Sequence, residues 1–213
     1  MAAVILIILA YLSGSVSYAF LISKAHGKDL RAVGSGNLGA TNLSRLLGKK
    51  WAYLCFGLDV LKGAIPMIAA KVIFVSVQPT PAELILWLIV GIAAILGHVF
   101  PLYLKFKGGK GVATSFGVVL GLWPYFTLPG LVAFVIWILC VLIWKYVSLG
   151  SIIAAVAFPV VLVICTATLD EWQFQKLWPL ITAAIILVAM VILLHRKNIQ
   201  RLLRGTENKV MQK

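Results

Sequence analysis

The amino-acid sequence is dominated by long apolar stretches, each about as long as a helix that crosses a lipid bilayer. Crossing the hydrocarbon core of about 30 Å takes about 20 apolar residues in a helix. The apolar stretches cover residues 4–23, 51–77, 84–104, 112–143, 146–168 and 177–194. Hydrophobic residues make up 62% of the chain and charged residues only 12%, which is unlike a soluble domain. The sequence therefore predicts an all-α integral membrane protein.

The fourth apolar stretch, residues 112–143, is too long for one span. As a single helix it would measure about 48 Å, because each residue adds about 1.5 Å. Pro124 and Pro129 lie near its middle, where proline interrupts a helix. We therefore expect two helices, 112–124 and 129–143. The complete prediction is seven transmembrane helices in a single multi-pass domain, residues 1–213.

The distribution of lysine and arginine predicts the orientation of these spans. With the N-terminus outside, the inner segments are 24–50, 105–110, the turn at Lys145 and the tail after residue 194, and they hold 16 of the 19 cations. Cytoplasmic loops of membrane proteins are enriched in these residues. We therefore expect the C-terminus in the cytoplasm. The net charge of +13 belongs to the bilayer edges, so no nucleic acid partner is expected.

The first inner segment contains a glycine-rich stretch at residues 34–42. Its glycine spacing matches the dinucleotide pattern GxGxxG, but that motif requires a preceding strand and here a membrane helix precedes it. What remains is a backbone that can turn sharply and present N–H groups to an anion, beside hydroxyl groups and a guanidinium. We expect a phosphate-binding loop, with a plain flexible loop as the alternative. Its candidate residues are Ser35, Gly36, Asn37, Gly39, Thr41, Asn42 and Arg45.

The second inner segment carries the sequence Gly-Gly-Lys-Gly just before a membrane helix. It shares only Gly109-Lys110 with the Walker A motif, since Gly111 stands where Ser or Thr is required. N–H groups at a helix start and an ammonium group together favour an anion. We expect phosphate binding here, the alternative being lysines that only anchor the protein at the headgroups. The candidate residues are His98, Lys107, Gly108, Gly109, Lys110, Gly111 and Thr114.

Polar residues also follow two later spans. His195 and Asn198 are three residues apart and so share one helix face, and both form hydrogen bonds readily. Ser148 and Ser151, at the turn after Lys145, are candidate phosphate donors. These four residues are predicted to bind substrate, with a purely structural role as the alternative.

Asp59 and Lys62 are charged residues within the second span. Their i, i+3 spacing predicts an ion pair inside the membrane, which we interpret as fixing helix packing rather than as catalytic.

Several common chemistries are missing from the sequence. No histidine is followed at the fifth position by aspartate, as acyl-CoA-dependent glycerolipid acyltransferases require. The inner segments offer only Asp29 and Glu207 as acids, so we expect no metal site and no cofactor. Phosphate binders are thus many and bases few, which favours a donor that is already activated and carries phosphate.

With these residues in view, the chain resembles the acyl-phosphate:glycerol-3-phosphate acyltransferase family of bacterial membranes over nearly its whole length. Three signatures carry the resemblance: residues 34–42 with Arg45, residues 97–101 with 107–114, and residues 195–207, which read HRKNIQRLLRGTE. The segments DVLKG (59–63) and SLGS (148–151) also look like family features.

The resemblance implies transfer of a fatty acyl group from acyl phosphate to the 1-hydroxyl of glycerol 3-phosphate, giving lysophosphatidic acid and phosphate. It also implies a bacterial cytoplasmic membrane, membrane lipids as neighbours, and an active site that faces the cytoplasm. On this resemblance, Gly108, Gly109, Lys110, Gly111 and Thr114 bind the acyl-phosphate head. Ser35, Arg45, Lys110, His195 and Asn198 are assigned to glycerol 3-phosphate and to catalysis.

Two further expectations follow. Because suitable protein bases are scarce, a bound phosphate dianion, whose second pKa is about 6, should take the proton from the attacking hydroxyl. The alternative function is a transporter or flippase of a phosphorylated anion or lipid. A transporter usually has polar or broken helices near the midplane, whereas these spans are apolar there apart from Asp59 and Lys62.

Overall fold

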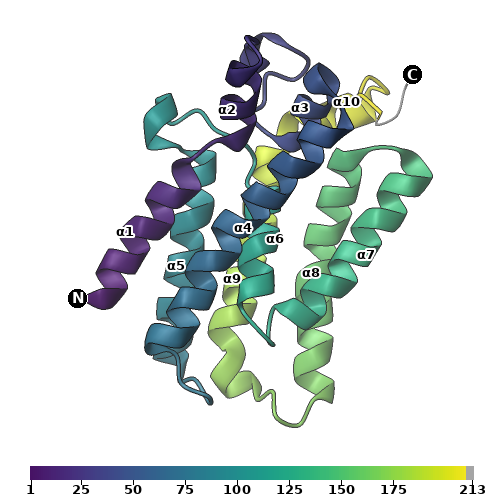
Figure 1. Cartoon of the computed structure of the whole chain (residues 1–213). Coiled ribbons are helices and arrows are strands. Elements are labelled where there is room, and N and C mark those ends of the chain that lie inside the picture. Colours follow the sequence, from purple (N-terminus) through teal and green to yellow (C-terminus); the bar gives the residue numbers. More distant parts are fainter. Residues whose placement is uncertain (210–213) are drawn as a thin grey trace. The chain divides into compact units, whose positions relative to one another are not determined.

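The computed structural model describes residues 1–209, and over that range its regular structure is entirely helical (Figure 1). Six helical segments are long and apolar enough to cross a bilayer. They are Ala2–Ala25, Lys49–Phe74, Pro81–Leu104, Thr127–Trp144, Val147–Thr168 and Phe174–Leu194. The protein is therefore an all-helical, multi-pass integral membrane protein, as predicted.

The first predicted span consists of two helices, α1 (Ala2–Ser15) and α2 (Tyr18–Ala25). The break lies at Val16 and Ser17, both in extended conformation, and the Ser17 hydroxyl caps α2 by accepting from the N–H of Phe20. Because residues 4–23 form a single apolar stretch, hydropathy gave no sign of this break. It leaves the carbonyl of Val16 available to a side chain from another helix.

The fourth apolar stretch is interrupted at Pro124, as predicted, whereas Pro129 lies in the first turn of the following helix. The chain forms α6 (Val112–Gly121) and then α7 (Thr127–Trp144). However, α6 has only 10 residues, or about 15 Å at 1.5 Å per residue, which is half the thickness of the hydrocarbon core. The count of seven spans and their orientation therefore stay predictions.

The other predicted spans correspond to α4 (Lys49–Phe74), α5 (Pro81–Val99), α8 (Val147–Thr168) and α9 (Phe174–Leu194). Hydropathy did not indicate two short amphipathic helices, α3 (Ala40–Leu47) and α10 (Arg196–Leu203). Two 3₁₀ turns, η1 (Leu30–Ala32) and η2 (Leu102–Leu104), complete the elements. The short elements carry or flank the glycine-rich and polar segments singled out from the sequence.

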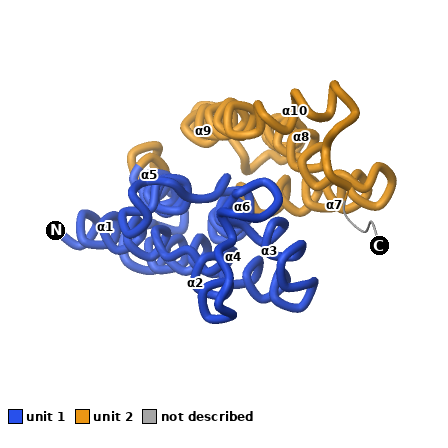
Figure 2. The backbone as a smooth tube through the Cα atoms, turned by 90° about the horizontal axis from the view of Figure 1, so that it is seen from above, with its two compact units in different colours: residues 1–79, 86–122 blue, residues 80–85, 123–213 orange. Residues whose placement is uncertain are grey.

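The helices form two compact units (Figure 2). Unit 1 comprises Met1–Pro79 and Leu86–Leu122, and unit 2 comprises Thr80–Ile85 and Trp123–Lys213.

In unit 1, glycines allow α4 and α6 to pack backbone against backbone. A Cβ at Gly63 would collide with the carbonyl of Thr114, and one at Gly117 would collide with that of Val60. Small residues serve this purpose in membrane helices, where van der Waals contact replaces the hydrophobic effect. The packing fixes the start of α6 against the middle of α4.

In unit 2, α8 packs against both α7 and α9, and α10 contacts α8 and α9. Gly150 of α8 lies against Trp137 of α7, and the rings of Phe126 and Phe158 meet edge to face with centroids 5.0 Å apart. Unit 2 thereby brings the start of α8 and the tail after α9 together.

Candidate active site

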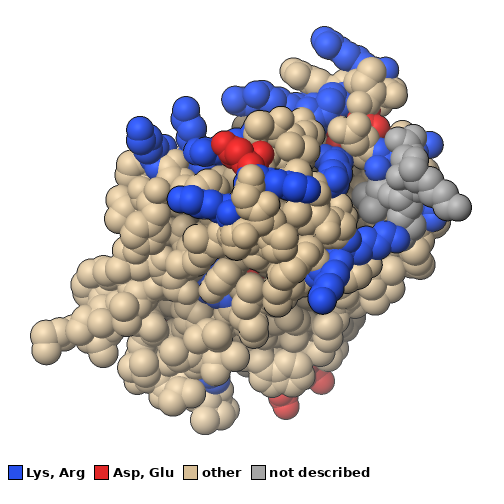
Figure 3. All heavy atoms as spheres, turned by 45° about the horizontal axis from the view of Figure 1, so that its top comes forward, with Lys and Arg blue, Asp and Glu red and all other residues tan. Residues whose placement is uncertain are grey.

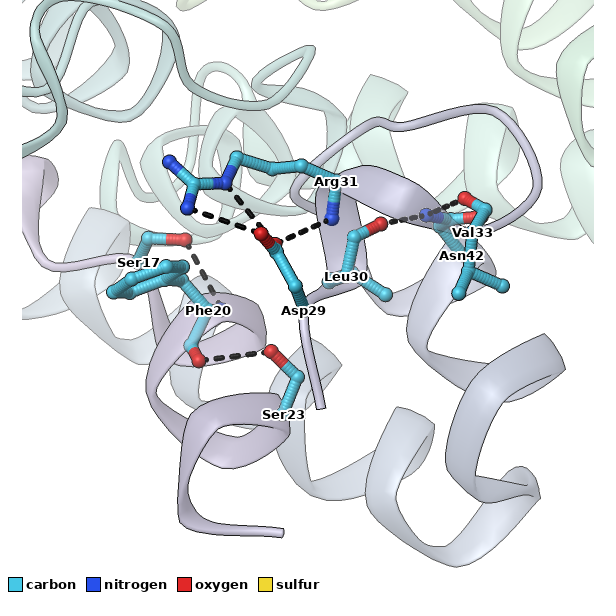
Figure 4. A network of polar contacts seen from close by, with 8 residues as sticks. All are labelled: Ser17, Phe20, Ser23, Asp29, Leu30, Arg31, Val33 and Asn42. Atoms are coloured by element: carbon cyan, nitrogen blue, oxygen red, sulfur yellow. Dashed lines mark hydrogen bonds and ion pairs between the residues drawn. The ribbon is translucent and has the colours of Figure 1, made fainter. Parts of the chain in front are cut away.

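The glycine-rich loop of unit 1 folds around the buried side chain of Asn42. Its Nδ2 donates to the carbonyls of Leu30 and Val33, at 3.1 and 2.9 Å (Figure 4). Its Oδ1 accepts from the N–H of Ser35 at 3.2 Å. Both amide hydrogens are thus used within the loop, so Asn42 holds the loop's shape and does not offer these hydrogens to a substrate.

The same loop leaves other predicted ligands accessible. Gly34 and Gly36 adopt φ of +56° and +66°, a region that favours glycine. The turn they make leaves Ser35 and Arg45 exposed, and the Arg45 side chain passes close to Gly34. Because α3 carries both Asn42 and Arg45, the helix that closes the loop also positions its guanidinium.

A neighbouring ion pair lies outside this loop. Arg31 donates from Nε and one terminal nitrogen to the two carboxylate oxygens of Asp29, at 3.1 and 3.2 Å (Figure 4). These hydrogen bonds lower the pKa of Asp29. A shallow cavity of about 400 Å³ beside the pair is lined by Phe20, Lys24, Gly27, Lys28, Asp29 and Arg31. None of the predicted site residues lines it.

The second glycine-rich loop folds back onto the end of α5. The N–H groups of Gly108 and Gly109 donate to the carbonyls of Val99 and His98, each at 3.1 Å. These two N–H groups are therefore occupied within the protein, which leaves the N–H groups at the start of α6 as the backbone donors for an anion. Gly111, with φ of +76°, caps α6, whose first-turn N–H groups follow it. Thr114 in that first turn is fully buried.

Beneath this loop lies a buried ionic cluster. Asp59 Oδ1 of α4 is 2.8 Å from Lys62 Nζ, so the predicted ion pair is confirmed. The same oxygen is 3.6 Å from Nδ1 of His98, which comes from α5. All three residues are at most 7% exposed. His98 is thus part of a charged cluster in the interior of unit 1.

In unit 2, the carboxylate of Glu207 collects three hydrogen bonds. Its Oε1 accepts from Ser148 Oγ at 2.9 Å and from Asn198 Nδ2 at 2.6 Å, and its Oε2 accepts from Arg201 Nε at 2.6 Å. Burial alone would raise the pKa of Glu207, but these hydrogen bonds outweigh it and lower the pKa. The ionised carboxylate therefore ties the tail to α8 and α10.

His195 lies between α9 and α10 and is 3% exposed. Its Nδ1 is 2.8 Å from the carbonyl of Val191, so Nδ1 carries the hydrogen. In the neutral ring Nε2 is then an acceptor. Ser151, in contrast, bonds to the carbonyl of Val147 and accepts from Trp137, which makes it a packing residue in unit 2.

No cluster of three or more His, Cys, Asp or Glu side chains suited to a metal ion occurs among residues 1–209. What the described residues offer is a set of hydroxyl, amide and cationic groups on glycine-rich turns. Such groups bind phosphate esters.

Comparison of the chain with known proteins identifies the family to which it belongs. Residues 4–205 match the family model described as glycerol-3-phosphate acyltransferase. The chain belongs to the glycerol-3-phosphate acyltransferase family.

Individual members of this family resemble the chain from end to end. The glycerol-3-phosphate acyltransferase of Geotalea daltonii is 42% identical, covering 96% of each chain, and that of Aquifex aeolicus is 41% identical, covering 98% of this chain and all of the relative. A solved structure is also similar: the crystal structure of PlsY (YgiH), an integral membrane glycerol 3-phosphate acyltransferase, in its glycerol 3-phosphate form. It superposes on this chain with a TM-score of 0.84 at 40% identity, and the match covers 99% of this chain and 96% of PlsY. Its lysophosphatidic acid form gives a TM-score of 0.80. These matches favour an acyltransferase over the transporter.

For this glycerol-3-phosphate acyltransferase, the sequence-predicted site residues fall into three places. In unit 1, Ser35 lies on the first loop, Arg45 on α3 directly after it, and Lys110 on the second loop. In unit 2, His195 lies at the end of α9 and Asn198 on α10. Within unit 2 the structure brings Asn198 and Ser148 together through Glu207.

Two features of the acyltransferase were missed from the sequence. Glu207 was noted as an acid but not as the centre of a cluster; an isolated carboxylate in a tail rich in arginine and lysine was the available signal. The approach of His98 to Asp59 joins two different helices, and no sequence spacing indicated it.

Proposed function

We propose that this member of the glycerol-3-phosphate acyltransferase family takes its acyl group from acyl phosphate and transfers it to the 1-hydroxyl of glycerol 3-phosphate. The products are lysophosphatidic acid and inorganic phosphate. Relatives support both ends of the reaction, since crystal structures of PlsY are described as a glycerol 3-phosphate form and a lysophosphatidic acid form.

The observation that carries the choice of donor is the shortage of a usable protein base. No histidine has an aspartate at the fifth position after it. The carboxylate that does reach a histidine, Asp59, is buried with Lys62 and His98. A thioester attack would need a base to activate the hydroxyl, whereas a mixed anhydride has a good leaving group and can react through positioning and charge stabilisation.

In the proposed step the 1-hydroxyl oxygen attacks the carbonyl carbon of acyl phosphate, and the bond from that carbon to the phosphate oxygen breaks. The proton of the hydroxyl passes to a phosphate oxygen. Phosphate with a pKa of about 6 accepts a proton at neutral pH, so no protein side chain has to act as the base. The ester forms and phosphate leaves, with atoms and charge balanced.

The residues divide by their chemistry. Lys110 with Gly108, Gly109, Gly111 and Thr114 serves the acyl-phosphate head, and Ser35, Arg45, Lys110, His195 and Asn198 serve glycerol 3-phosphate. Accessible Ser35 and Arg45 suit direct phosphate contact. The other substrate-binding candidates keep that role: Gly36, Asn37, Gly39, Thr41 and Lys107. Asn42, His98, Ser148 and Ser151 support the site through the contacts described above.

We further propose seven spans in a bacterial cytoplasmic membrane, with the N-terminus outside and these loops in the cytoplasm. The 16 cations of the predicted inner segments support this orientation. Figure 3 shows a face on which lysine and arginine side chains greatly outnumber acidic ones, as expected for a cytoplasmic surface.

The donor assignment is tested by incubating purified protein with glycerol 3-phosphate and either acyl phosphate or acyl-CoA of the same chain length. Lysophosphatidic acid should form from acyl phosphate and not above background from acyl-CoA. The matched control omits glycerol 3-phosphate and measures donor hydrolysis alone. Comparable rates from the two donors would show that the protein contains a base able to drive attack on a thioester.

A further inference from the structure

A buried ionic network connects three parts of unit 1 directly under the second glycine-rich loop. Lys62 Nζ lies 2.8 Å from Asp59 Oδ1 and donates to the carbonyl of Val16 at 2.6 Å, at the break between α1 and α2. His98 of α5 approaches the same carboxylate oxygen at 3.6 Å. Charged groups within a membrane protein are costly and are kept where they pair or serve a function. Because this network also reaches the α1–α2 break and α5, it can do more than hold α4 in place.

The geometry of His98 shows what the network can act on. Its Nδ1 faces Asp59, and a Cβ placed on Gly109 would collide with its Nε2, so Gly109 lies directly against that nitrogen. The backbone carbonyl of His98 also accepts the N–H of Gly109 at 3.1 Å. The imidazole therefore packs directly against the loop that carries Lys110.

The surroundings of His98 bear on its role. A carboxylate beside an imidazole is the usual design of a general base, but the free nitrogen of the base must then reach the substrate. Here Gly109 lies against Nε2, and the residue is only 7% exposed. This packing favours a role for His98 in shaping the loop.

We propose that Asp59, Lys62 and His98 are positioning residues, which hold the loop at residues 108–111 in the shape that binds the phosphate of the acyl donor. The inference rests on the proposed function of that loop. Lys62 neutralises Asp59, the Asp59 carboxylate lies 3.6 Å from the imidazole, and the imidazole packs against Gly109. Glycine at residue 109 is required because only a residue without a side chain lets the backbone lie on the ring.

The test separates positioning from stability by comparing single and double variants. Asp59→Asn leaves Lys62 as a buried cation without its carboxylate, which should lower the melting temperature, because breaking one half of a buried pair is strongly destabilising. Asp59→Asn/Lys62→Met removes both charges and should recover most of that loss. Lys71→Met is the matched control, since Lys71 lies on the same helix and contacts the carbonyl of Ser76 instead.

Kinetics on the folded, membrane-inserted fraction give the decisive readout. In the double variant the KM for acyl phosphate should stay raised by about tenfold or more although the melting temperature recovers, since displacing a positioning group can cost up to about a hundredfold. His98→Gln should raise the same KM. Lys71→Met should stay within about twofold of the parent.

A second readout does not depend on catalysis. Hydrogen exchange of residues 105–111 should be faster in the double variant and in His98→Gln, because the Gly108 and Gly109 amides lose their support. If the parent protein shows no transfer from acyl phosphate, the proposed function fails and the exchange measurement alone decides the inference. A double variant that recovers its stability with parental KM for both substrates, or with parental exchange in this segment, overturns the proposal.

Discussion

At the scale of single residues, the two loops separate groups that contact substrate from groups that shape the backbone. Ser35 is exposed on a turn whose form depends on the buried amide of Asn42, and Arg45 is exposed on α3, which follows that turn. His195 has its Nδ1 hydrogen committed to Val191, so the ring presents a defined tautomer. The residues expected to bind phosphate thus rest on neighbours that contribute geometry only.

Removing a phosphate-binding cation should stop the reaction. Arg45→Ala and Lys110→Ala should each abolish measurable acyl transfer, because charge-assisted hydrogen bonds contribute about 1.5–3 kcal/mol each before any transition-state effect. His195→Gln keeps hydrogen bonding without basicity and should retain measurable turnover. The measurement is the initial rate of lysophosphatidic acid formation in folded, membrane-inserted protein.

The His195→Gln variant distinguishes the two possible routes for the proton. If His195→Gln were as inactive as Lys110→Ala while still binding glycerol 3-phosphate, His195 would be the general base. Proton transfer to phosphate would then be the wrong mechanism.

At the scale of elements, two contacts keep the loops in place: the packing of α4 on α6, and the attachment of α10 and the tail to α8. The first depends on glycines that remove side chains from the helix contact. The second depends on one carboxylate, Glu207, that accepts from Ser148, Asn198 and Arg201. One contact is apolar and the other ionic, so they respond to different perturbations.

A side chain at Gly117 should separate α4 from α6. Gly117→Ala places a Cβ against the carbonyl of Val60, and we expect a loss of about 1–3 kcal/mol in stability, as for other overpacked contacts. Gly57→Ala on α4 is the control, since nothing lies within 4 Å of its added Cβ; a better helix former there should be neutral or stabilising by up to about 1 kcal/mol. Thermal unfolding in detergent measures both. Equal melting temperatures for the two variants would contradict the close packing.

The tail contact should depend on pH. The folded-state pKa of Glu207 lies below its ordinary value of 4.5, so the carboxylate contributes stability that is fully present above about pH 4.5 and is lost as the pH falls through the lower folded value. Glu207→Gln should lower stability at pH 7 and flatten this acid dependence. Melting temperatures between pH 3 and 7 test it, and a variant curve parallel to the parent curve would rule out the role of the charge.

At the scale of the whole molecule, the helices form two compact units, and each carries part of the predicted machinery. The glycine-rich loops with Arg45 and Lys110 belong to unit 1, and His195 with Asn198 belongs to unit 2. The predicted site residues therefore come from both units. The proposed topology requires all of them to lie on the same side of the membrane.

Accessibility of introduced cysteines tests this requirement. In a background without Cys55, Cys140 and Cys165, single cysteines at residues 35, 107 and 198 should react with an impermeant thiol reagent only from the cytoplasmic side. A cysteine at residue 176 should react only from outside, because the charge bias places that loop there. Labelling of residues 35 and 198 from opposite sides would contradict the proposed topology.

Reading the chain alone was enough to predict the membrane class, the interruption at Pro124, the Asp59–Lys62 pair and the family signatures. Each of these depends on residues close together in the chain: an apolar run, a residue that cannot continue a helix, or charges one turn apart. Such features survive in a one-dimensional description because the interacting groups are near neighbours. The family match over residues 4–205 agrees with them.

Which polar groups meet across helices depends on how the helices pack in three dimensions. Hydropathy could not show that α1 ends before Ser17 or that α6 is ten residues long, since an apolar run does not report where its helix stops. Likewise, no spacing indicates that His98 reaches Asp59 or that Glu207 gathers Ser148 and Asn198. These contacts arise when separate helices pack, because a buried charge or amide has to find its partners wherever the fold places them.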